Sequence, residues 1–376
     1  MKIVYVVTAE ILGPQNSGGV QYSTRNITVL RQAFGEDNIY VCAITKHKEY
    51  LAKKNANTEI FYSNRSKVSI LKNTLQGRLQ FDRNVEDSVI EYIATLKCDT
   101  VIFDSSRMGY LQERLPKEIP GILFMLNIEK DYIAAFIKTN PIYLVLKRAF
   151  ELSEAMAVKN ADTIVALNNR DALQLDRYYG KKADLILPIT MDDIYVKPND
   201  TKLTSSSTKL QLLFVGSRFA ANEHSVKWFI NKVMPHVDAE LTVIGNGFEK
   251  LTSKLQRHNV KIIGRVDDLS QYYHEANAIV SPIRVGSGMK VKTTEALMYG
   301  KPMFATDEAL EGYEVDDIKS IYRCNSAQDF ISEISEQSKN ESAISFDPNI
   351  RQRFLEKYNT VRYISSVKSL IEGQHK

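Results

Sequence analysis

The residues best suited to do chemistry lie close together between positions 284 and 302. Gly286 and Gly288 follow a predicted strand end, and a helix is expected from about Met289 to Tyr299, with Gly300 at its C-cap. Glycines allow the backbone to pass close to a ligand, and the start of a helix presents free N–H groups and the positive end of its dipole. This pattern favours a phosphate site, and the alternative interpretation is an ordinary turn between a strand and a helix.

Charged residues surround the same turn. Arg284, Lys290 and Lys292 supply three cations, and Glu295 follows in the predicted helix. Lys290 and Lys292 are two positions apart and do not share one helix face, so at most one of them is expected to reach a ligand together with Arg284. A carboxylate at Glu295 could accept hydrogen bonds from two ribose hydroxyls. Phosphate and ribose together suggest a nucleotide, whereas solvated lysines on a plain turn are the alternative.

The elements that must position these residues alternate along the whole chain. Short apolar runs are separated by stretches of helical periodicity, among them 20–34, 85–96, 143–159 and 170–179. Continuous apolar strands separated by helices predict parallel sheets that are covered on both faces. The strands expected in the first half are Ile3–Val7, Ile39–Ile44, Val101–Phe103, Ile122–Leu126, Thr163–Leu167 and Leu185–Leu187. Those expected in the second half are Leu212–Val215, Leu241–Ile244, Val260–Ile263, Ile279–Ser281, Met303–Ala305 and Ile321–Arg323.

The alternation is interrupted once, near residue 200, by a polar stretch with the composition of a linker. We therefore expect an α/β fold of two doubly wound, Rossmann-like domains that face each other across a cleft, with ligands at the carboxyl ends of the strands. The predicted parts are a first domain at 1–195, a linker at 196–209, a second domain at 210–350 and a C-terminal helix at 351–376. That helix either packs on its own domain or crosses back to the first one.

Composition limits the classes of protein that fit. A chain of 376 residues with 44% hydrophobic and 25% charged residues suits two globular domains. The sequence contains no run of about 18 apolar residues, so no membrane span is predicted. The three cysteines are far apart and predict neither a disulfide framework nor a zinc site. The net charge of +4 forms no dense basic stripe, so no nucleic acid partner is expected. The expected location is cytoplasmic.

One segment suggests a membrane surface. Residues Lys138–Phe150 mix basic and apolar side chains, a pattern typical of helices that rest on a membrane. One interpretation is a peripheral contact at the inner face of the membrane, where a lipid-linked acceptor would lie. Packing in the protein core is the alternative explanation for its apolar residues.

The glycine-rich block resembles the signature of glycosyltransferase family 4, the glycosyl transferases group 1 of the GT-B fold. That signature runs Arg-x-Gly-x-Gly-x-x-x-Lys-x-x-Glu-Ala-x-x-x-Gly-x-Pro, and the residues in register are Arg284, Gly286, Gly288, Lys292, Glu295, Ala296, Gly300 and Pro302. The segments 213–222 and 262–266 resemble the strand before the phosphate loop and the segment that meets the base. Residues 17–20 resemble the glycine loop near the transferred sugar. The similarity is dense in the second half and thin in the first.

The resemblance implies a retaining glycosyltransferase that uses a nucleotide-diphosphosugar donor, needs no metal or other cofactor, and acts on a glycan, lipid-linked or protein-linked acceptor. The residues implied in catalysis are Arg218, Lys290, Lys292 and Glu295. Those implied in substrate binding are Gly18, Gly19, Asn127, Glu129, Gly216, Asn222, Val266, Arg284, Gly286, Ser287, Gly288 and Met289. Synthesis of a surface polysaccharide or glycoconjugate is the expected role. We interpret the acidic pairs at 192–193, 267–268 and 316–317 as turn or helix-start residues, not as metal ligands.

Two positions depart from the family pattern. Ser287 stands where many members carry the first of two glutamates, and Leu126 stands where a histidine near the transferred sugar is expected. In that segment Asn127 or Glu129 could take over the histidine's contact. The alternative function is a catalytically weak, glycosyltransferase-like subunit that directs a partner transferase. A homodimer is a further possibility for the assembly.

Overall fold

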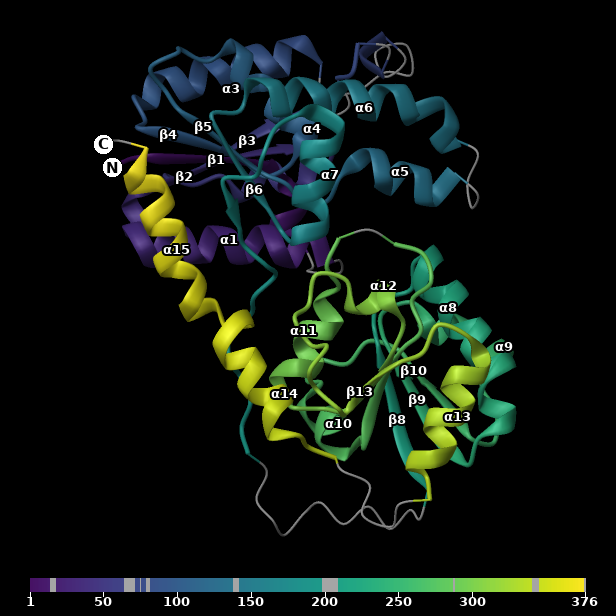
Figure 1. Ribbon diagram of the computed structural model, residues 1–376. Coiled ribbons are helices and arrows are strands. Elements are labelled where there is room, and N and C mark those ends of the chain that lie inside the picture. The colour runs from purple at the N-terminus through teal and green to yellow at the C-terminus, as the bar shows by residue number, and fades with distance from the viewer. Residues whose placement is uncertain are drawn as a thin grey trace. The chain divides into compact units, whose positions relative to one another are not determined.

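The computed structural model describes residues 1–13, 18–63, 72–74, 76–78, 82–137, 142–197, 209–286, 288–339 and 345–374. Most of the predicted linker lies outside these residues. The chain divides into two units, of which the first comprises Met1–Pro188 and Val361–Lys376 and the second comprises Ile189–Thr360. Each unit is an α/β domain built on its own sheet (Figure 1).

The first unit contains a seven-stranded sheet in the order β3-β2-β1-β4-β5-β6-β7. All of its neighbouring strands run parallel. The strands are β1 (Ile3–Thr8), β2 (Ile39–Thr45), β3 (Thr58–Tyr62), β4 (Thr100–Phe103), β5 (Gly121–Phe124), β6 (Thr163–Ala166) and β7 (Leu185–Ile186). The order reverses between β1 and β4, so the loops after these two strands leave the sheet in opposite directions.

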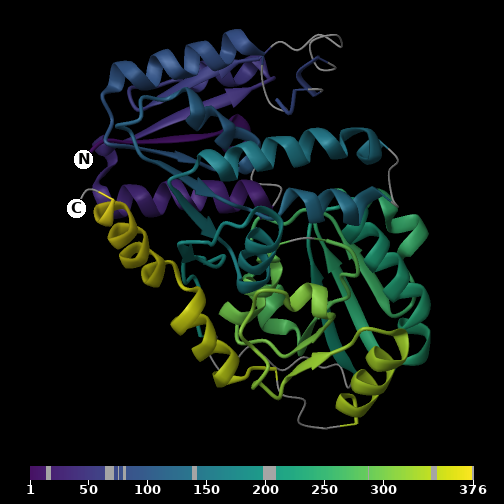
Figure 2. The same ribbon diagram turned by 45° about the horizontal axis from the view of Figure 1, so that its top comes forward.

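Helices cover both faces of this sheet (Figure 2). They are α1 (Gly18–Phe34), α3 (Arg83–Leu96), α4 (Ser106–Gly109), α5 (Glu129–Ile137), α6 (Ile142–Asn160), α7 (Asn169–Tyr179) and α15 (Thr360–Gly373). Alternate residues of β1 enter two separate cores, with Tyr5 on one side and Val6 on the other. The Tyr5 side is closed by α1 and α15, and the Val6 side by α3, α6 and α7.

The second unit contains a six-stranded parallel sheet in the order β10-β9-β8-β11-β12-β13. Its strands are β8 (Leu210–Val215), β9 (Ala239–Ile244), β10 (Val260–Ile263), β11 (Ala278–Ser281), β12 (Met303–Ala305) and β13 (Ile321–Arg323). Its helices are α8 (Ala220–Lys232), α9 (Thr252–Leu255), α10 (Ser270–Glu275), α11 (Val291–Met298), α12 (Asp307–Leu310), α13 (Ala327–Gln337) and α14 (Pro348–Arg353). This order reverses between β8 and β11.

The predicted α/β architecture with two doubly wound sheets is confirmed. Every strand expected in the second half forms, and each strand expected in the first half forms at least in part. One strand was missed, the edge strand β3, because its sequence Thr-Glu-Ile-Phe-Tyr mixes polar and apolar residues. The continuous apolar pattern used for the other strands applies only to strands that are buried on both faces.

The C-terminal segment joins the two units. A single helix was expected there, but α14 passes into a π-helical turn at Phe354–Tyr358, and α15 begins only after an extended Asn359. The backbone of Met191 pairs with the chain at this break. Its N–H donates to the Tyr358 carbonyl, and its carbonyl accepts from the N–H of Thr360. Beyond the break, α15 packs Tyr363, Val367 and Ile371 into the core of the first unit.

The first boundary also differs from the expected one. Residues 189–195 belong to the second unit, whereas the first domain was expected to extend to residue 195. Tyr195 explains the difference, because its ring lies 6.0 Å from that of Tyr299, 5.7 Å from that of His274 and 5.8 Å from that of Phe346. The polar composition of the linker revealed where the helices and strands stop, but not which unit these preceding residues contact.

Candidate functional site

The candidate site of the second unit lies where the strand order reverses. The strands β8 and β11 are neighbours there, and their following loops lead to α8 on one side and to α11 on the other. A reversal of this kind leaves an opening at the carboxyl ends of the two strands, where open α/β sheets bind ligands. Both loops carry residues that the sequence analysis singled out.

At two glycines near the end of β8, the backbone leaves no room for a side chain. A Cβ atom on Gly245 would lie 1.9 Å from the carbonyl oxygen of Gly216. A Cβ atom on Gly216 would lie 3.0 Å from Nζ of Lys292 and 2.9 Å from Nδ2 of Asn222. Asn222 is buried and donates to the carbonyl of Ser217 over 2.7 Å. These contacts place Gly216, Asn222 and Lys292 at one point of the site.

The glycine-rich turn after β11 is tight. Gly288 has a φ of 65°, in the left-handed region that only glycine adopts readily. Met289 is buried beside it, and Lys290 is extended, so α11 begins at Val291 instead of at about Met289 as expected. Gly300 follows the helix with a φ of 61°, which confirms the predicted helix end. Ser287 lies outside the described residues.

The two lysines of this turn have different surroundings. Nζ of Lys290 lies 2.6 Å from Oε1 of Glu308 and 2.6 Å from the carbonyl oxygen of Gly288. Nζ of Lys292 lies 2.7 Å from Oδ1 of Asn222 and 4.4 Å from the ring centroid of Phe214. Lys292 therefore points toward the end of β8, whereas Lys290 forms an ion pair with a carboxylate. The two lysines point apart as expected, but helical spacing is not the reason, because Lys290 precedes α11 in an extended conformation.

The charge on Lys292 is poorly compensated. Burial and, to a smaller extent, the nearby charge of Lys290 together lower the pKa of its amine to about 7, while Glu295 acts the other way. An amine in this state gains stabilisation from any anion placed beside it. The arrangement is suited to bind a negatively charged group next to Gly216.

Two arginines lie on the outer side of the site. Nε of Arg218 lies 2.6 Å from Oε2 of Glu223, which also pairs with Lys227. The guanidinium of Arg284 lies 4.9 Å from the ring centroid of Trp228 and is exposed. Both side chains are held by partners on α8, and both keep donors on their accessible side.

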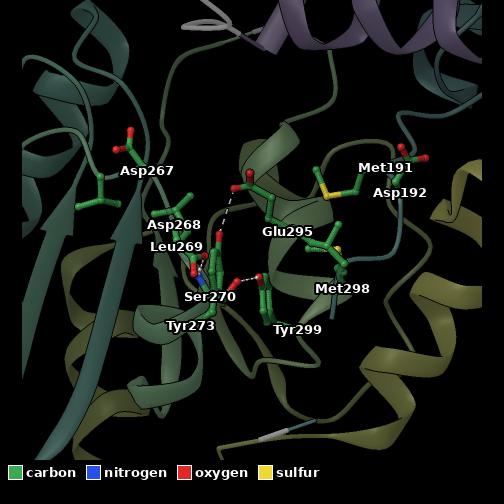
Figure 3. Close-up of a pocket in the computed structure, with 12 residues that line it drawn as sticks. Met191, Asp192, Asp267, Asp268, Leu269, Ser270, Tyr273, Glu295, Met298 and Tyr299 are labelled. Atoms are coloured by element: carbon green, nitrogen blue, oxygen red, sulfur yellow. Dashed lines mark hydrogen bonds between the residues drawn. The ribbon is translucent and has the colours of Figure 1, made fainter. Parts of the chain in front are cut away.

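A cavity of about 290 Å³ adjoins the carboxylate of the site. Its lining residues are Met191, Asp192, Ile194, Val266, Asp267, Asp268, Leu269, Ser270, Tyr273, Glu295, Met298 and Tyr299. Figure 3 shows Glu295 reaching from α11 toward the hydroxyl of Tyr273, which donates to Oε2 over 3.1 Å. The ring of Tyr273 stacks on that of Tyr299 at 4.4 Å, and Ser270 contacts the hydroxyl of Tyr299. The cavity thus has an aromatic wall, and the Glu295 carboxylate lies beside that wall among the acidic lining residues.

The carboxylate of Glu295 is half-buried, and the cost of burying its charge exceeds the stabilisation that its neighbours provide. Burial raises its pKa, while the hydroxyl of Tyr273 and the charge of Lys292 act in the opposite direction. The hydroxyl of Tyr273 contacts one of the two carboxylate oxygens. A ligand with two adjacent hydroxyls would add donors to this group, as the sequence analysis expected for ribose.

The acidic pairs have structural contacts. Asp268 accepts from the backbone N–H of Ser270 at the start of α10, which lowers the pKa of its carboxyl. In the other pairs, Asp193 contacts Arg351, Asp316 contacts Arg323 and Asp317 contacts Arg353. Within the described part of the chain, no three His, Cys, Asp or Glu side chains gather as they would around a metal ion.

The first unit holds the remaining candidates at the carboxyl ends of its own strands. Gly18 and Gly19 are exposed at the start of α1, and Leu126 and Asn127 are half-buried after β5. Glu129 is buried, and its two oxygens lie 2.8 and 3.0 Å from the guanidinium of Arg107. This bidentate pair holds the buried carboxylate of Glu129 against Arg107.

The described part of the segment 138–150 contains no helix that could cross a membrane, and neither does any other described part of the chain. Residues 138–141 lie outside the described residues. Within α6, Leu144 is exposed, whereas Ala149 and Phe150 are buried, so the apolar residues of this segment are divided between surface and core.

The chain has the two-domain α/β fold called GT-B, which it shares with several solved structures. A sucrose-phosphate synthase from Thermosynechococcus elongatus superposes with a TM-score of 0.76 at 12% identity, covering 100% of this chain and 99% of that chain. HepE from Anabaena, in complex with UDP and glucose, gives a TM-score of 0.69 at 12% identity, with 99% and 100% covered. The lipopolysaccharide outer core galactosyltransferase WaaB in its apo form gives 0.66 at 16% identity, with 100% of both chains covered.

A family model also matches part of the second unit. Residues 209–340 match the family model described as glycosyl transferases group 1. The resemblance expected from the glycine-rich block is therefore confirmed over this stretch, which contains β8 to β13 and all the site residues of the second unit. No curated protein matches the sequence.

Proposed function

We propose that the protein is a retaining glycosyltransferase that transfers a sugar from a nucleotide diphosphate to a glycan, lipid-linked or protein-linked acceptor. The observation that carries the proposal is the placement of Lys292 and Glu295 on one short helix at the reversal point of the second sheet. The match of residues 209–340 to the glycosyl transferases group 1 supports the same class of reaction.

The donor would be held in two parts. Its ribose would donate to Glu295 in the cavity beside Tyr273, with the base against Val266. Its diphosphate would lie between Gly216 and the start of α11, beside the amine of Lys292. Arg218 lies close enough in sequence to Gly216 to approach the same group.

Transfer leaves a nucleoside diphosphate with an additional negative charge. Preorganised cations and N–H groups stabilise such a charge more in the transition state than in the ground state, typically by several kcal/mol for each well-placed donor. A lysine whose pKa is lowered by burial gains in this way as the charge develops. We propose that this electrostatic stabilisation replaces a metal ion, so that turnover does not require one.

We propose a uridine diphosphate sugar as the donor. HepE from Anabaena is described in complex with UDP-glucose, and TarM of S. aureus in complex with UDP. Both superpose on 99% of this chain, with TM-scores of 0.66 and 0.67. The likeness supports the donor proposal only through the shared fold.

The second candidate function is a catalytically weak subunit that directs a partner transferase. It is favoured by Leu126, which offers no polar group at the position expected for a histidine, and by Glu129, which is occupied by Arg107. Retaining transfer by front-face attack needs no protein base in principle, so the first function remains the proposal.

Nucleotide release from a panel of UDP-, GDP-, ADP- and TDP-sugars, with and without EDTA, tests the proposal, together with thermal-shift binding of each donor. Slow hydrolysis of one donor that EDTA does not change is the expected result. Binding without turnover, even with acceptors present, would favour the subunit function. Absence of binding to every donor would refute the nucleotide site.

A further inference from the structure

A buried polar cluster of the first unit lies at the reversal point of its own sheet. Asp104 is the first residue after β4, and it is 3% exposed. The hydroxyl of Tyr5, on β1, donates to one of its carboxylate oxygens, and the hydroxyl of Ser23, on α1, contacts the other. Asn26 donates to the hydroxyl of Tyr5 over 3.1 Å.

The hydroxyl of Ser23 has a second acceptor within reach. Its Oγ lies 3.0 Å from the carbonyl oxygen of Gly19, one turn earlier in α1. A serine hydroxyl carries one proton and can donate only one hydrogen bond. When Asp104 is ionised, it is an acceptor only, and the proton of Ser23 must serve it. When Asp104 is protonated, it can donate to Ser23, whose own proton is then available to Gly19.

We propose that Asp104 is a positioning residue for the first turn of α1, and that gain or loss of its proton moves the hydrogen bond of Ser23 between Asp104 and the carbonyl of Gly19. The cluster thereby links a titratable side chain at the end of β4 to the glycines that begin α1. Its role in the reaction rests on the proposed function, in which Gly18 and Gly19 lie near the transferred sugar.

The groups around Asp104 allow its carboxyl to gain and lose a proton, as the proposal requires. Burial raises the pKa of Asp104 to about 7, and the hydrogen bonds from Ser23, Tyr5 and Asn26 lower it only in part. The guanidinium of Arg25 stacks between the rings of Tyr22 and Tyr363 at 5.1 and 5.0 Å. The groups that face the cluster are thus Tyr5 from β1, Ser23, Asn26, Tyr22 and Arg25 from α1, and Tyr363 from α15.

The sign of the pH dependence follows from the direction of this shift. A carboxyl whose pKa is raised in the folded state binds its proton more tightly there than in the unfolded chain, so its contribution is fully present below its ordinary pKa. That contribution is lost as the pH rises toward 7. The wild type is therefore expected to lose stability over this interval more steeply than Asp104→Asn, which cannot titrate.

The first experiment compares urea unfolding of the wild type and Asp104→Asn between pH 5 and pH 8. We expect the ratio of their unfolding constants to change by about tenfold or more across this range. Hydrogen exchange of the first-turn amides of α1 is measured alongside, and their protection factors, corrected for the intrinsic pH dependence of exchange, should change with pH in the wild type but not in Ser23→Ala. The matched control is Ser88→Ala, because Ser88 makes the same bond to the carbonyl four residues earlier, over 3.0 Å, on the exposed face of α3.

The second readout is the pH profile of turnover with a fixed donor. The acceptor KM of the wild type should change about threefold or more between pH 6 and pH 8, and that of Asp104→Asn should be flat, with the donor KM unchanged in both. Equal pH profiles of stability and exchange in wild type and Asp104→Asn would overturn the inference. Because stability and exchange are measured without substrate, they test it even if the protein transfers no sugar.

Discussion

Replacement of Glu295 by glutamine is the most direct test of the nucleotide site. Glutamine keeps the size of the side chain and one oxygen that can accept from Tyr273, but it removes the charge and one acceptor. The ribose of the donor would therefore lose a charge-assisted hydrogen bond. One of its hydroxyls would face the N–H₂ group of the glutamine instead. The substitution keeps Lys292 itself but removes one charge that raises the pKa of its amine, so binding is compared at a pH well below 7.

The magnitude follows from the chemistry of the lost contact. A hydrogen bond to a charged group contributes about 1.5–3 kcal/mol, and each 1.4 kcal/mol corresponds to a tenfold change in affinity. We therefore expect Glu295→Gln to weaken nucleotide binding by ~10- to ~100-fold, and Glu295→Ala by at least as much. Tyr273→Phe, which keeps the stacked ring and removes one donor to Glu295, should cost no more than about tenfold.

Stability provides the control for this substitution. Burial raises the pKa of Glu295, so the contribution of its proton is present below its ordinary pKa and is lost as the pH rises through the raised value. A neutral glutamine has no such loss, and Glu295→Gln should unfold in urea at the same or higher concentration at pH 8. Titration calorimetry with UDP and with the preferred donor then measures binding alone. Affinity within twofold of wild type, in a folded protein, would refute the ribose assignment.

The other predictions concern the cations and the glycines. Lys292→Met should lower kcat by about 10²-fold, whereas Lys290→Met, which removes a lysine already paired with Glu308, should lower it by less than tenfold; donor hydrolysis rates measure both. Because an anion favours the charged form of Lys292, nucleotide binding at pH 8 should take up close to one proton and at pH 6 almost none, which calorimetry in two buffers of different ionisation enthalpy detects. In Gly19→Ala, no atom lies within 4 Å of the new Cβ, so the variant should unfold at the same or a higher urea concentration. Its turnover should nevertheless fall if the sugar lies against this turn.

Much of the fold could be predicted from the sequence because its strands are buried on both faces. Such strands are continuous apolar runs, and both sheets are made almost entirely of them. The edge strand β3 escaped because one of its faces is partly exposed, so its pattern is neither continuous nor long enough to alternate clearly. The position of α15 in the first unit depends on packing between residues more than 300 positions apart, which no local pattern contains.

The site could be predicted less completely than the fold. The glycine-rich turn, its cations and the carboxylate of α11 could all be located from spacing, but the periodicity argument for Lys290 and Lys292 did not apply, because Lys290 precedes the helix. Which lysine points toward β8 could not be decided, because the start of the helix was expected two residues too early. The partners Tyr273 and Asp104 lie on other elements, and only the tertiary structure brings them to Glu295 and to α1.

The two groups proposed to hold the donor lie on a single helix, and this fixes their separation. Lys292 and Glu295 are three positions apart on α11, so they lie on neighbouring parts of its surface and about 4.5 Å apart along its axis. One faces Asn222 at the end of β8, and the other faces Tyr273 and the cavity. In the proposed function, phosphate and ribose recognition would therefore depend on the same short helix. Gly288 lies before this helix, and its left-handed backbone shapes the turn that leads to Lys290 and then to α11. A change in this glycine should thus weaken both contacts together, whereas changes in the lysine or the glutamate should affect them one at a time.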